Sequence, residues 1–133
     1  MFYDSKGRLM KVIDSLGNST IYTYDGRDLV TKVRLVGASG GIYENIHTYD
    51  DDGRLVAKTN NDGKHKVFFY NELNQVVSVR DENGNITDMT YDFAGNLLTS
   101  TQSLQGNGNN STPVTTTYEY DIMNNLVALI DAE

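Results

Sequence analysis

The chain lacks cysteine altogether, and this absence excludes several kinds of site at once. Without thiols there is no disulfide framework, no thiolate nucleophile and no cysteine-ligated zinc. Long apolar runs are missing as well, since none approaches the roughly 20 residues that a membrane-spanning helix needs. The first residues hold no basic segment followed by an apolar one, so they do not resemble a signal peptide. We therefore expect no membrane insertion.

Positive charge is also scarce. The 11 Lys and Arg residues stand against 18 Asp and Glu residues, which gives a formal net charge of −7. Binding to nucleic-acid phosphates needs clustered cations, and the sequence contains no such cluster. We therefore expect no nucleic-acid partner. The length of 133 residues fits one domain. The hydrophobic share of 38% is on the low side for a globular protein, but with a charged share of 22% the sequence does not combine the low hydrophobicity and high charge of disordered chains.

The most informative feature that is present is an internal repeat. A Tyr-Asp pair, once Tyr-Asn, recurs with a base spacing of 21 residues, and two intervals are longer, at 25 and 29. Each pair is followed by a short turn, then Gly or Asn, then an apolar residue. We expect these positions to be structural. They are Tyr3, Asp4, Gly7, Leu9, Tyr24, Asp25, Leu29, Tyr49, Asp50, Gly53, Leu55, Tyr70, Val76, Tyr91, Asp92, Gly95, Leu97, Tyr120, Asp121 and Leu126.

Two turns fall within each period. The second turn reads DSLGN at 14–18, NNDGK at 60–64 and DENGN at 81–85. Asp-Gly and Asn-Gly pairs favour hairpins, and Asp-x-x-Gly fits a type I turn with Gly at its fourth position. The copy at 24–29 is one residue short, which predicts a different turn there. Each period therefore holds two strands of about six or seven residues.

Alternation along the chain predicts the two faces of these strands. Large side chains stand two residues apart before each Tyr-Asp turn, as in Tyr22 and Tyr24 or Met89 and Tyr91, and Thr23 and Thr90 lie between them. Residues two apart in a strand share a face. Short links favour antiparallel pairing of consecutive strands.

The predicted fold is therefore all-β: an antiparallel β-hairpin repeat array of about six repeats and twelve strands, forming a curved meander sheet. We expect one domain, 1–133, and two insertions, at 36–43 and 102–114, that form surface loops. The repeat boundaries are expected near 1–21, 22–43, 44–67, 68–88, 89–115 and 116–133.

The motif Y-D-x-x-G-R-L, intact at 3–9 and 49–55, resembles the YD or RHS repeat, and six copies cover essentially the whole chain. The resemblance implies a hairpin ribbon that spirals into a hollow shell. Such shells enclose a toxic C-terminal domain in bacterial Rhs and polymorphic toxins and in Tc toxins, and form an extracellular adhesion scaffold in teneurins. The resemblance further implies that this chain is a fragment of a longer array and that it is secreted or located at the cell surface.

The partners implied are flanking repeats or a second copy, paired through open strand edges, and an enclosed toxin domain. Self-cleavage and toxicity are not carried over, because these 133 residues contain neither a cargo domain nor an Asp-Pro-x-Gly signature.

The sequence signals for a metal or catalytic site are weak compared with the repeat signal. The acidic runs at 50–53 and 81–88 suggest calcium, but both fall where the repeat demands a turn, and neither has the Glu that closes an EF-hand loop. His47 and His65 have no partners at ligand or triad spacing. We expect no catalytic residue, no metal and no cofactor, and therefore no enzyme.

The tyrosines allow two interpretations. As a structural ladder, each ring packs on the next hairpin. As an exposed ladder, the rings stack on sugars, which makes a glycan the partner. The predicted function is a non-catalytic structural module of a β-shell that encapsulates or displays a toxin or adhesion domain. The alternative is a carbohydrate-binding or adhesion module.

Overall fold

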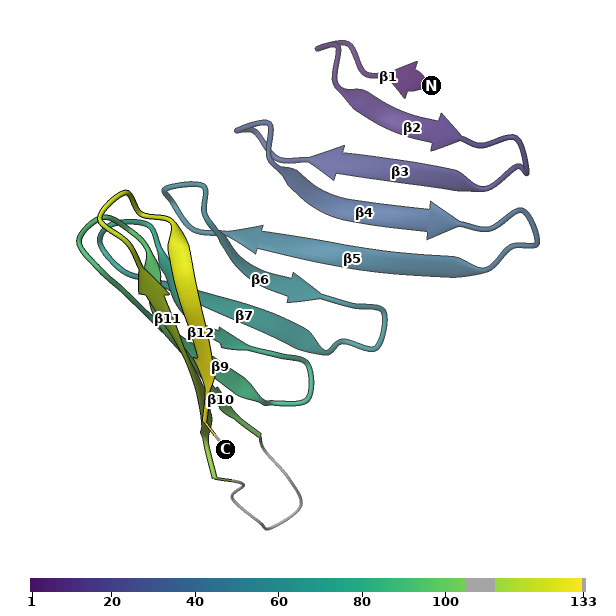
Figure 1. Ribbon diagram of the computed structural model, residues 1–133. Helices are drawn as coiled ribbons and strands as arrows, with labels where there is room; N and C mark the ends of the chain where they lie inside the picture. The colour runs from purple at the N-terminus through teal and green to yellow at the C-terminus, as the bar shows by residue number, and fades with distance from the viewer. Residues whose placement is uncertain (105–111, 133) are drawn as a thin grey trace. The chain divides into compact units, whose positions relative to one another are not determined.

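The computed structural model describes residues 1–104 and 112–132, and within them the chain is all-β (Figure 1). The twelve strands expected from the sequence are confirmed. No helix capable of crossing a membrane occurs in this described part. The strands are β1 (Phe2–Tyr3), β2 (Leu9–Ile13), β3 (Ser19–Tyr24), β4 (Val30–Val36), β5 (Ile42–Tyr49), β6 (Leu55–Thr59), β7 (His65–Tyr70), β8 (Val76–Arg80), β9 (Ile86–Tyr91), β10 (Leu97–Ser103), β11 (Val114–Tyr120) and β12 (Leu126–Asp131).

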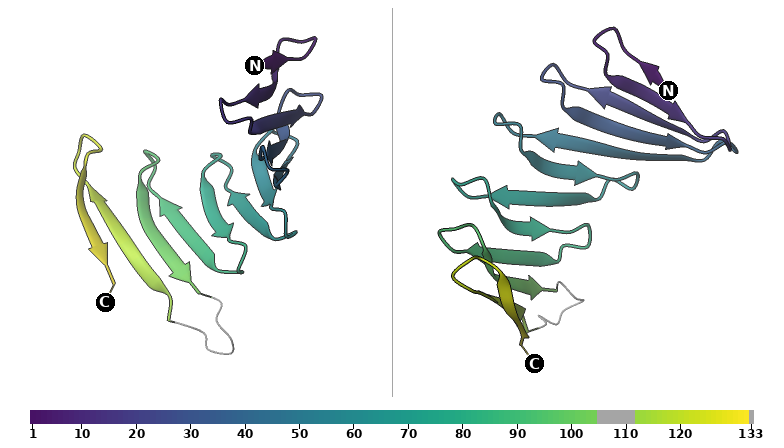
Figure 2. Two further views of the ribbon diagram at one scale, coloured as in Figure 1. Left: turned by 90° about the vertical axis from the view of Figure 1, so that its right-hand side faces the viewer. Right: turned by 45° about the horizontal axis from the view of Figure 1, so that its top comes forward.

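The chain divides into two units, Met1–His65 and Lys66–Glu133. In the first unit, β1 to β6 pair antiparallel in chain order. In the second, β7 to β12 do the same. Figure 2 shows the alternating directions of consecutive strands within each unit. The predicted antiparallel hairpin array is thus confirmed.

The register sorts the side chains as the alternation predicts. Tyr22 lies opposite Val33, and Tyr118 opposite Leu129, on what we call the tyrosine face. The residues between them project from the other side, the threonine face. There the hydroxyl groups of Thr90 and Thr99 lie 2.6 Å apart, and the same contact joins two further threonines of β10 and β11 at 2.9 Å.

Ten turns between consecutive strands in the described part of the chain share one geometry. The first residue donates its N–H to the carbonyl of the fifth, and the fourth donates to the carbonyl of the first, as in Asp4 N to Arg8 O at 2.9 Å and Gly7 N to Asp4 O at 3.0 Å. The fourth residue has a positive φ, which is 80° at Gly7. This is the type I turn followed by a left-handed bulge residue that closes three-residue hairpins. We call the turns that follow a repeat tyrosine the tyrosine turns. They span 4–8, 25–29, 50–54, 71–75, 92–96 and 121–125.

The turn of the repeat copy at 24–29 differs from the one expected. It is not shorter, because Asp25 N donates to Leu29 O at 2.9 Å like every other copy. Asp28 takes the left-handed position with φ 66°, which Asp tolerates better than most residues. Leu29 therefore ends the turn, and Val30 pairs with Tyr24 at the strand position that Leu9 holds opposite Tyr3.

The first insertion is also not the loop that was expected. Its residues lengthen the two strands, since Val36 pairs with Ile42 and Leu35 with Tyr43, and only 37–41 remain as a tight turn. Most of the second expected loop, at 102–114, falls on residues 105–111, outside the described part of the chain. At its two ends, β10 extends to Ser103 and β11 begins at Val114.

A β-bulge recurs beside every repeat tyrosine. In β4, for example, Val30 pairs with Tyr24 but Lys32 with Thr23, so Thr31 is an extra residue on the returning strand. The same shift occurs in all six hairpins that a tyrosine turn closes. Bulges increase local twist and bend the strand that carries them. The extra residues are Met10, Thr31, Val56, Val77, Leu98 and Val127.

No residue of the described chain is fully buried. The accessible surface is 9211 Å², whereas a compact protein of 14.8 kDa exposes about 7,000 Å². The physical reason is that a single layer of strands covers neither of its faces. The repeat tyrosines are therefore half-buried at most, and Tyr3 is exposed.

Candidate functional site

The tyrosine turns are the most elaborate polar feature of the chain. Their first residue is Asp, or Asn at 71, and its Oδ1 accepts two backbone N–H groups. In the turn 92–96, Asp92 Oδ1 accepts from Ala94 N at 2.9 Å and Asn96 N at 2.8 Å. The same pair of bonds forms at Asp4, Asp25 and Asp121. The carboxylate is thus engaged in holding the loop.

The second carboxylate oxygen binds the side chain of the fifth residue. Arg8 Nε lies 2.6 Å from Asp4 Oδ2, and Arg54 Nε lies 2.7 Å from Asp50 Oδ2. In the second unit, Asn96 Nδ2 replaces arginine and donates to Asp92 Oδ2 at 2.8 Å.

These bonds lower the pKa of the turn aspartates. At Asp92, the side-chain hydrogen bond from Asn96 is the largest cause, and the amide of the same residue adds to it. At Asp4, the Arg8 amide lowers the pKa most. At Asp50, partial desolvation acts the other way, but the side chain and amide of Arg54 outweigh it. A carboxylate with a lowered pKa that is bonded to its own turn is a structural anion and a poor general base.

Neighbouring tyrosine turns are also joined to each other. In the first unit, Arg27 Nη1 donates to Asp50 O at 2.7 Å, and Arg8 Nη1 bonds to the Asp28 carboxylate. In the second unit, Asn96 Nδ2 donates to Asn124 Oδ1 at 2.9 Å. These contacts connect segments about twenty or more residues apart in sequence, so they fix one hairpin against the next.

Tyrosine hydroxyl groups make a second set of links between hairpins. Tyr24 donates to Leu9 O at 2.8 Å and Tyr91 to Val76 O at 2.8 Å. Tyr49 donates to Val30 O at 2.9 Å, and desolvation followed by the charge of Asp25 raises its pKa. In these three copies the acceptor is the first strand residue of the preceding repeat. The links support the structural interpretation of the tyrosines, whose role as repeat positions stays a prediction.

The histidines and the acidic runs are occupied by local contacts. His47 Nδ1 lies 3.1 Å from Val30 O, and His65 Nδ1 lies 2.9 Å from Thr59 Oγ1. The first acid of each candidate calcium run, Asp50 or Asp81, binds the amides of its own turn. Across residues 1–104 and 112–132, no group of three or more His, Asp or Glu side chains is arranged to hold a metal ion.

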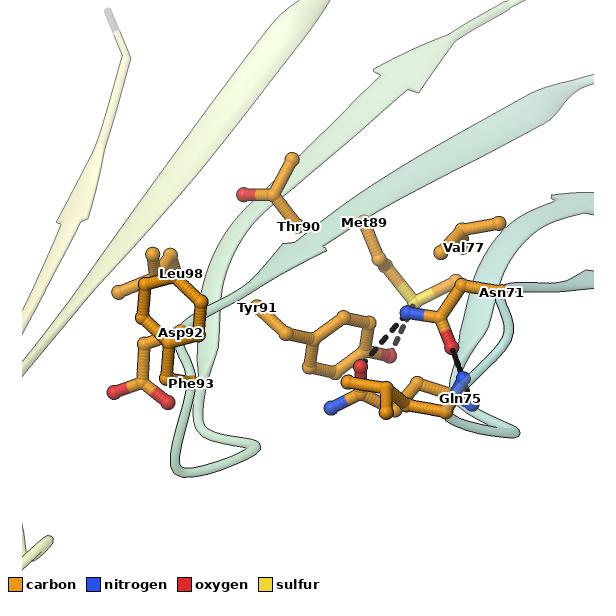
Figure 3. Close-up of a pocket in the computed structure, with 10 residues that line it drawn as sticks. Asn71, Gln75, Val77, Met89, Thr90, Tyr91, Asp92, Phe93 and Leu98 are labelled. Carbon is orange, nitrogen blue, oxygen red and sulfur yellow. Dashed lines mark hydrogen bonds between the residues drawn. The ribbon is translucent and has the colours of Figure 1, made fainter.

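An apolar groove is the feature that sequence reasoning missed. It has a volume of about 510 Å³ and lies in the second unit, between the turns 71–75 and 92–96 (Figure 3). Phe93 and Leu98 both line it, and Tyr91 points toward the turn 71–75. The signal available in the sequence was the presence of Leu73 and Phe93 at turn positions where the copies of the first unit have polar residues or glycine. The groove is lined by Asn71, Leu73, Gln75, Val77, Met89, Thr90, Tyr91, Asp92, Phe93 and Leu98.

Comparison with known proteins agrees with this architecture. The tRNA nuclease WapA of Bacillus subtilis (strain 168) is 31% identical to this chain over 130 residues, and so is the tRNA3(Ser)-specific nuclease WapA of Bacillus spizizenii. Each alignment covers 97% of this chain but 5% of the relative. The chain thus spans about one-twentieth of the length of these relatives.

Solved structures show the same fold. The crystal structures of TcdB2-TccC3-Cdc42 and of TcdB2-TccC3 without its hypervariable C-terminal region each give a TM-score of 0.58, at 19% and 20% identity. Both matches cover 98% of this chain and 9% of the other. The family model described as RHS Repeat matches residues 3–40 and 70–109, which is more than half of the sequence. The chain therefore belongs to the RHS repeat family.

Proposed function

We infer that this chain is a non-catalytic segment of a β-shell wall, and that the complete wall encloses a toxin domain. The observation that carries the proposal is the single layer of strands with no fully buried residue. Such a layer is not complete by itself, because each hairpin needs neighbours to cover its apolar side chains. The hydrogen bonds between successive hairpins, through Tyr24, Tyr91 and Arg27, are what a wall built from repeats requires.

The recurring bulge gives the wall a means to bend. All six bulges lie on the returning strand beside a tyrosine turn, so their added twist accumulates in one sense. Curvature of this kind is needed for a sheet to enclose a space. The shell partners of the segment are then flanking repeats, which pair with the outer strands.

The enclosed toxin domain and a secreted or cell-surface location rest on relatives. Two of these are named as tRNA nucleases, and the matching segment is 5% of their length. Nuclease activity therefore belongs to proteins in which a segment of this type is a small part. For this chain, a toxin as cargo is the proposal that the resemblance supports.

Thiol labelling of the two sheet faces tests enclosure. Met89 lies on the tyrosine face and its neighbour Thr90 on the threonine face, and the chain has no native cysteine. We would express the complete reading frame that contains these residues, in a cysteine-free background, with either Met89→Cys or Thr90→Cys. A closed wall makes one of the two unreactive toward a bulky polyethylene-glycol maleimide, while a small maleimide labels both.

Equal labelling of both positions by the bulky reagent in the native protein would overturn the enclosure proposal. Denaturation supplies the control, because it must make both positions equally reactive.

Glycan binding through the tyrosines stays a prediction. The three hydroxyl groups that bond to a neighbouring hairpin are already engaged, which disfavours sugar recognition by those residues. A glycan-array measurement on the 133-residue chain tests it. Binding that Tyr43→Ala abolishes would favour the alternative, since this substitution removes the ring and Tyr43 is more exposed than these three tyrosines.

A further inference from the structure

The tips of the tyrosine turns differ between the two units. In the first unit their second and third residues are polar or glycine: Ser5, Lys6, Gly26, Arg27, Asp51 and Asp52. In the second unit each tyrosine turn places one or two large apolar side chains in solvent, which makes four in all. We call these four side chains the apolar rim, which consists of Leu73, Phe93, Ile122 and Met123. Such side chains are not needed by the turn, whose bonds are made by the backbone and by its first residue.

The apolar rim continues into the groove. Leu73 and Phe93 form part of the groove lining together with Val77, Met89 and Leu98, and Figure 3 draws these residues around the groove. Leu73, Phe93 and the groove therefore make one apolar surface on the tyrosine-turn edge of this unit. Ile122 and Met123 lie on the next tyrosine turn, which the bond from Asn96 Nδ2 to Asn124 Oδ1 joins to the turn of Phe93. Exposed apolar surfaces that are continuous and rimmed by polar groups are typical of interaction sites.

The charge around this surface is negative. Residues 66–133 hold nine Asp and Glu residues but only two cations, Lys66 and Arg80, whereas residues 1–65 hold nine of each sign. The three tyrosine turns of the second unit contain Glu72, Asp92 and Asp121 and no Lys or Arg. A partner that complements this surface is thus cationic as well as apolar.

The spacing of the tyrosine turns matches a bound partner helix better than a bound partner strand. Successive tyrosine turns are separated by two strands, which is about 9.6 Å. A helix returns to the same face after seven residues, or about 10.5 Å. A β-strand advances about 10 Å in three residues, and the side chain there points to the opposite side. A helix with heptad spacing can therefore place one apolar side chain at each turn, while a strand cannot.

We propose that the apolar rim and groove of the second unit bind an amphipathic helix of a partner polypeptide, with apolar residues in heptad spacing and Lys or Arg on its flanks. This docking surface goes beyond the wall function, and it does not depend on what the wall encloses.

The test uses a fluorescently labelled three-heptad peptide of leucine and lysine, with the leucines in heptad positions, and the complete 133-residue chain. Fluorescence anisotropy is expected to show binding that weakens with added salt, because the charge complementarity is exposed to solvent. Leu73→Ser together with Phe93→Ser should weaken binding by about tenfold or more, as the loss of a central apolar anchor does.

Leu16→Ser is the matched control. Leu16 occupies the third position of its turn, as Leu73 does, and is 78% exposed against 72%, but it lies on the other edge of the first unit. Its replacement should leave the affinity unchanged. Far-ultraviolet circular dichroism of each variant checks that the strands are retained.

Several results would overturn the proposal. One is equal binding of a peptide of the same composition with alternating leucine and lysine, which would indicate an extended partner. A second is equal binding of a heptad peptide of leucine and glutamate, which would remove the charge argument. A third is no peptide binding, with self-association of the chain that the Phe93 variant abolishes, since the occupant would then be a second copy.

Discussion

The first residue of each tyrosine turn holds the turn backbone through one oxygen atom. Asp92 Oδ1 accepts the amides of the third and fifth turn residues, and the amide oxygen of Asn71 accepts the equivalent pair at 3.0 Å each. The turn therefore needs a side-chain acceptor at this position but not a charge. This is why Asp and Asn exchange along the repeat, and the sequence predicts these turns well because the whole requirement is local.

Acid should weaken the fold. Seven turn aspartates have a pKa below the ordinary value of 3.8 in the folded chain. A lowered folded pKa gives a stabilisation that is complete above 3.8 and is lost as the pH falls through the lowered values. Urea unfolding at a series of pH values should show a steep loss of stability only below this point.

Asp92→Asn separates charge from hydrogen bonding in that experiment. The amide oxygen keeps the two backbone bonds, so the variant should fold and show a shallower loss of stability in acid. An unchanged pH profile for this variant would contradict the assignment of Asp92 to the acid sensitivity.

The cost of replacing a turn glycine by alanine should depend on whether its φ is positive and not on steric crowding. Gly7 has φ 80° and Gly26 lies outside the left-handed region, while a Cβ added to either would meet no atom within 4 Å. Gly7→Ala should therefore cost about 1 kcal/mol of unfolding free energy. Gly26→Ala should cost nothing or stabilise slightly, because alanine restricts the unfolded chain. Denaturant unfolding of the two variants measures this difference, and equal effects would show that φ is not the cause.

Hairpins are the next scale, and their mutual contacts are less visible in the sequence. The alternation of large residues with threonine predicts which side chains share a face, since that pattern has a period of two. It does not predict the bulges, because an extra residue such as Thr31 or Val77 looks like any other strand residue. It also does not place Leu29, because Asp28 takes the left-handed position that Gly7 holds in the first copy, and only the pairing with Tyr24 reveals that Val30 is the equivalent of Leu9.

The groove could not be predicted either. It depends on how two turns that are twenty-one residues apart in sequence lie beside each other, and the apolar residues at their tips have no periodic pattern of their own.

Loss of a tyrosine hydroxyl should loosen one hairpin from the next. Tyr91 in β9 donates to Val76 O in β8 at 2.8 Å, so Tyr91→Phe leaves that carbonyl without this donor. We expect a loss of about 1 kcal/mol in unfolding free energy. Tyr43→Phe is the control, because its hydroxyl is exposed and lies 3.4 Å from Asn45 Oδ1. Chemical denaturation of both variants should give a cost for Tyr91 alone, and a similar cost for both would mean that the link adds no stability.

At the scale of the whole molecule, the missing feature is a second layer. A chain of this length has enough apolar side chains for a core, yet none of the described residues is fully buried. Within each unit, short links explain this result, because consecutive strands that pair side by side extend one layer and do not fold back over it. The stability of the chain must then come from strand pairing, turn bonds and half-buried faces, and its apolar side chains remain available for association.

Self-association through the last strand should follow. In the second unit, β12 pairs with β11 on one side only, and Leu126, Val127, Leu129 and Ile130 are all exposed on it. An edge strand with this composition is a template for pairing with another chain. Sedimentation velocity of the 133-residue chain should therefore show a sedimentation coefficient that rises with protein concentration.

Val127→Lys combined with Leu129→Lys should suppress this rise, because lysine on an edge strand opposes pairing by charge repulsion and by the cost of desolvating its ammonium group. Leu16→Lys adds one lysine at an exposed turn and should leave the association unchanged. If the chain stays monomeric at every concentration, or if the turn variant suppresses association as strongly as the β12 variant, the edge of β12 is not the site of contact. In that case the apolar rim, tested by Phe93→Ser, is the next surface to examine by the same measurement.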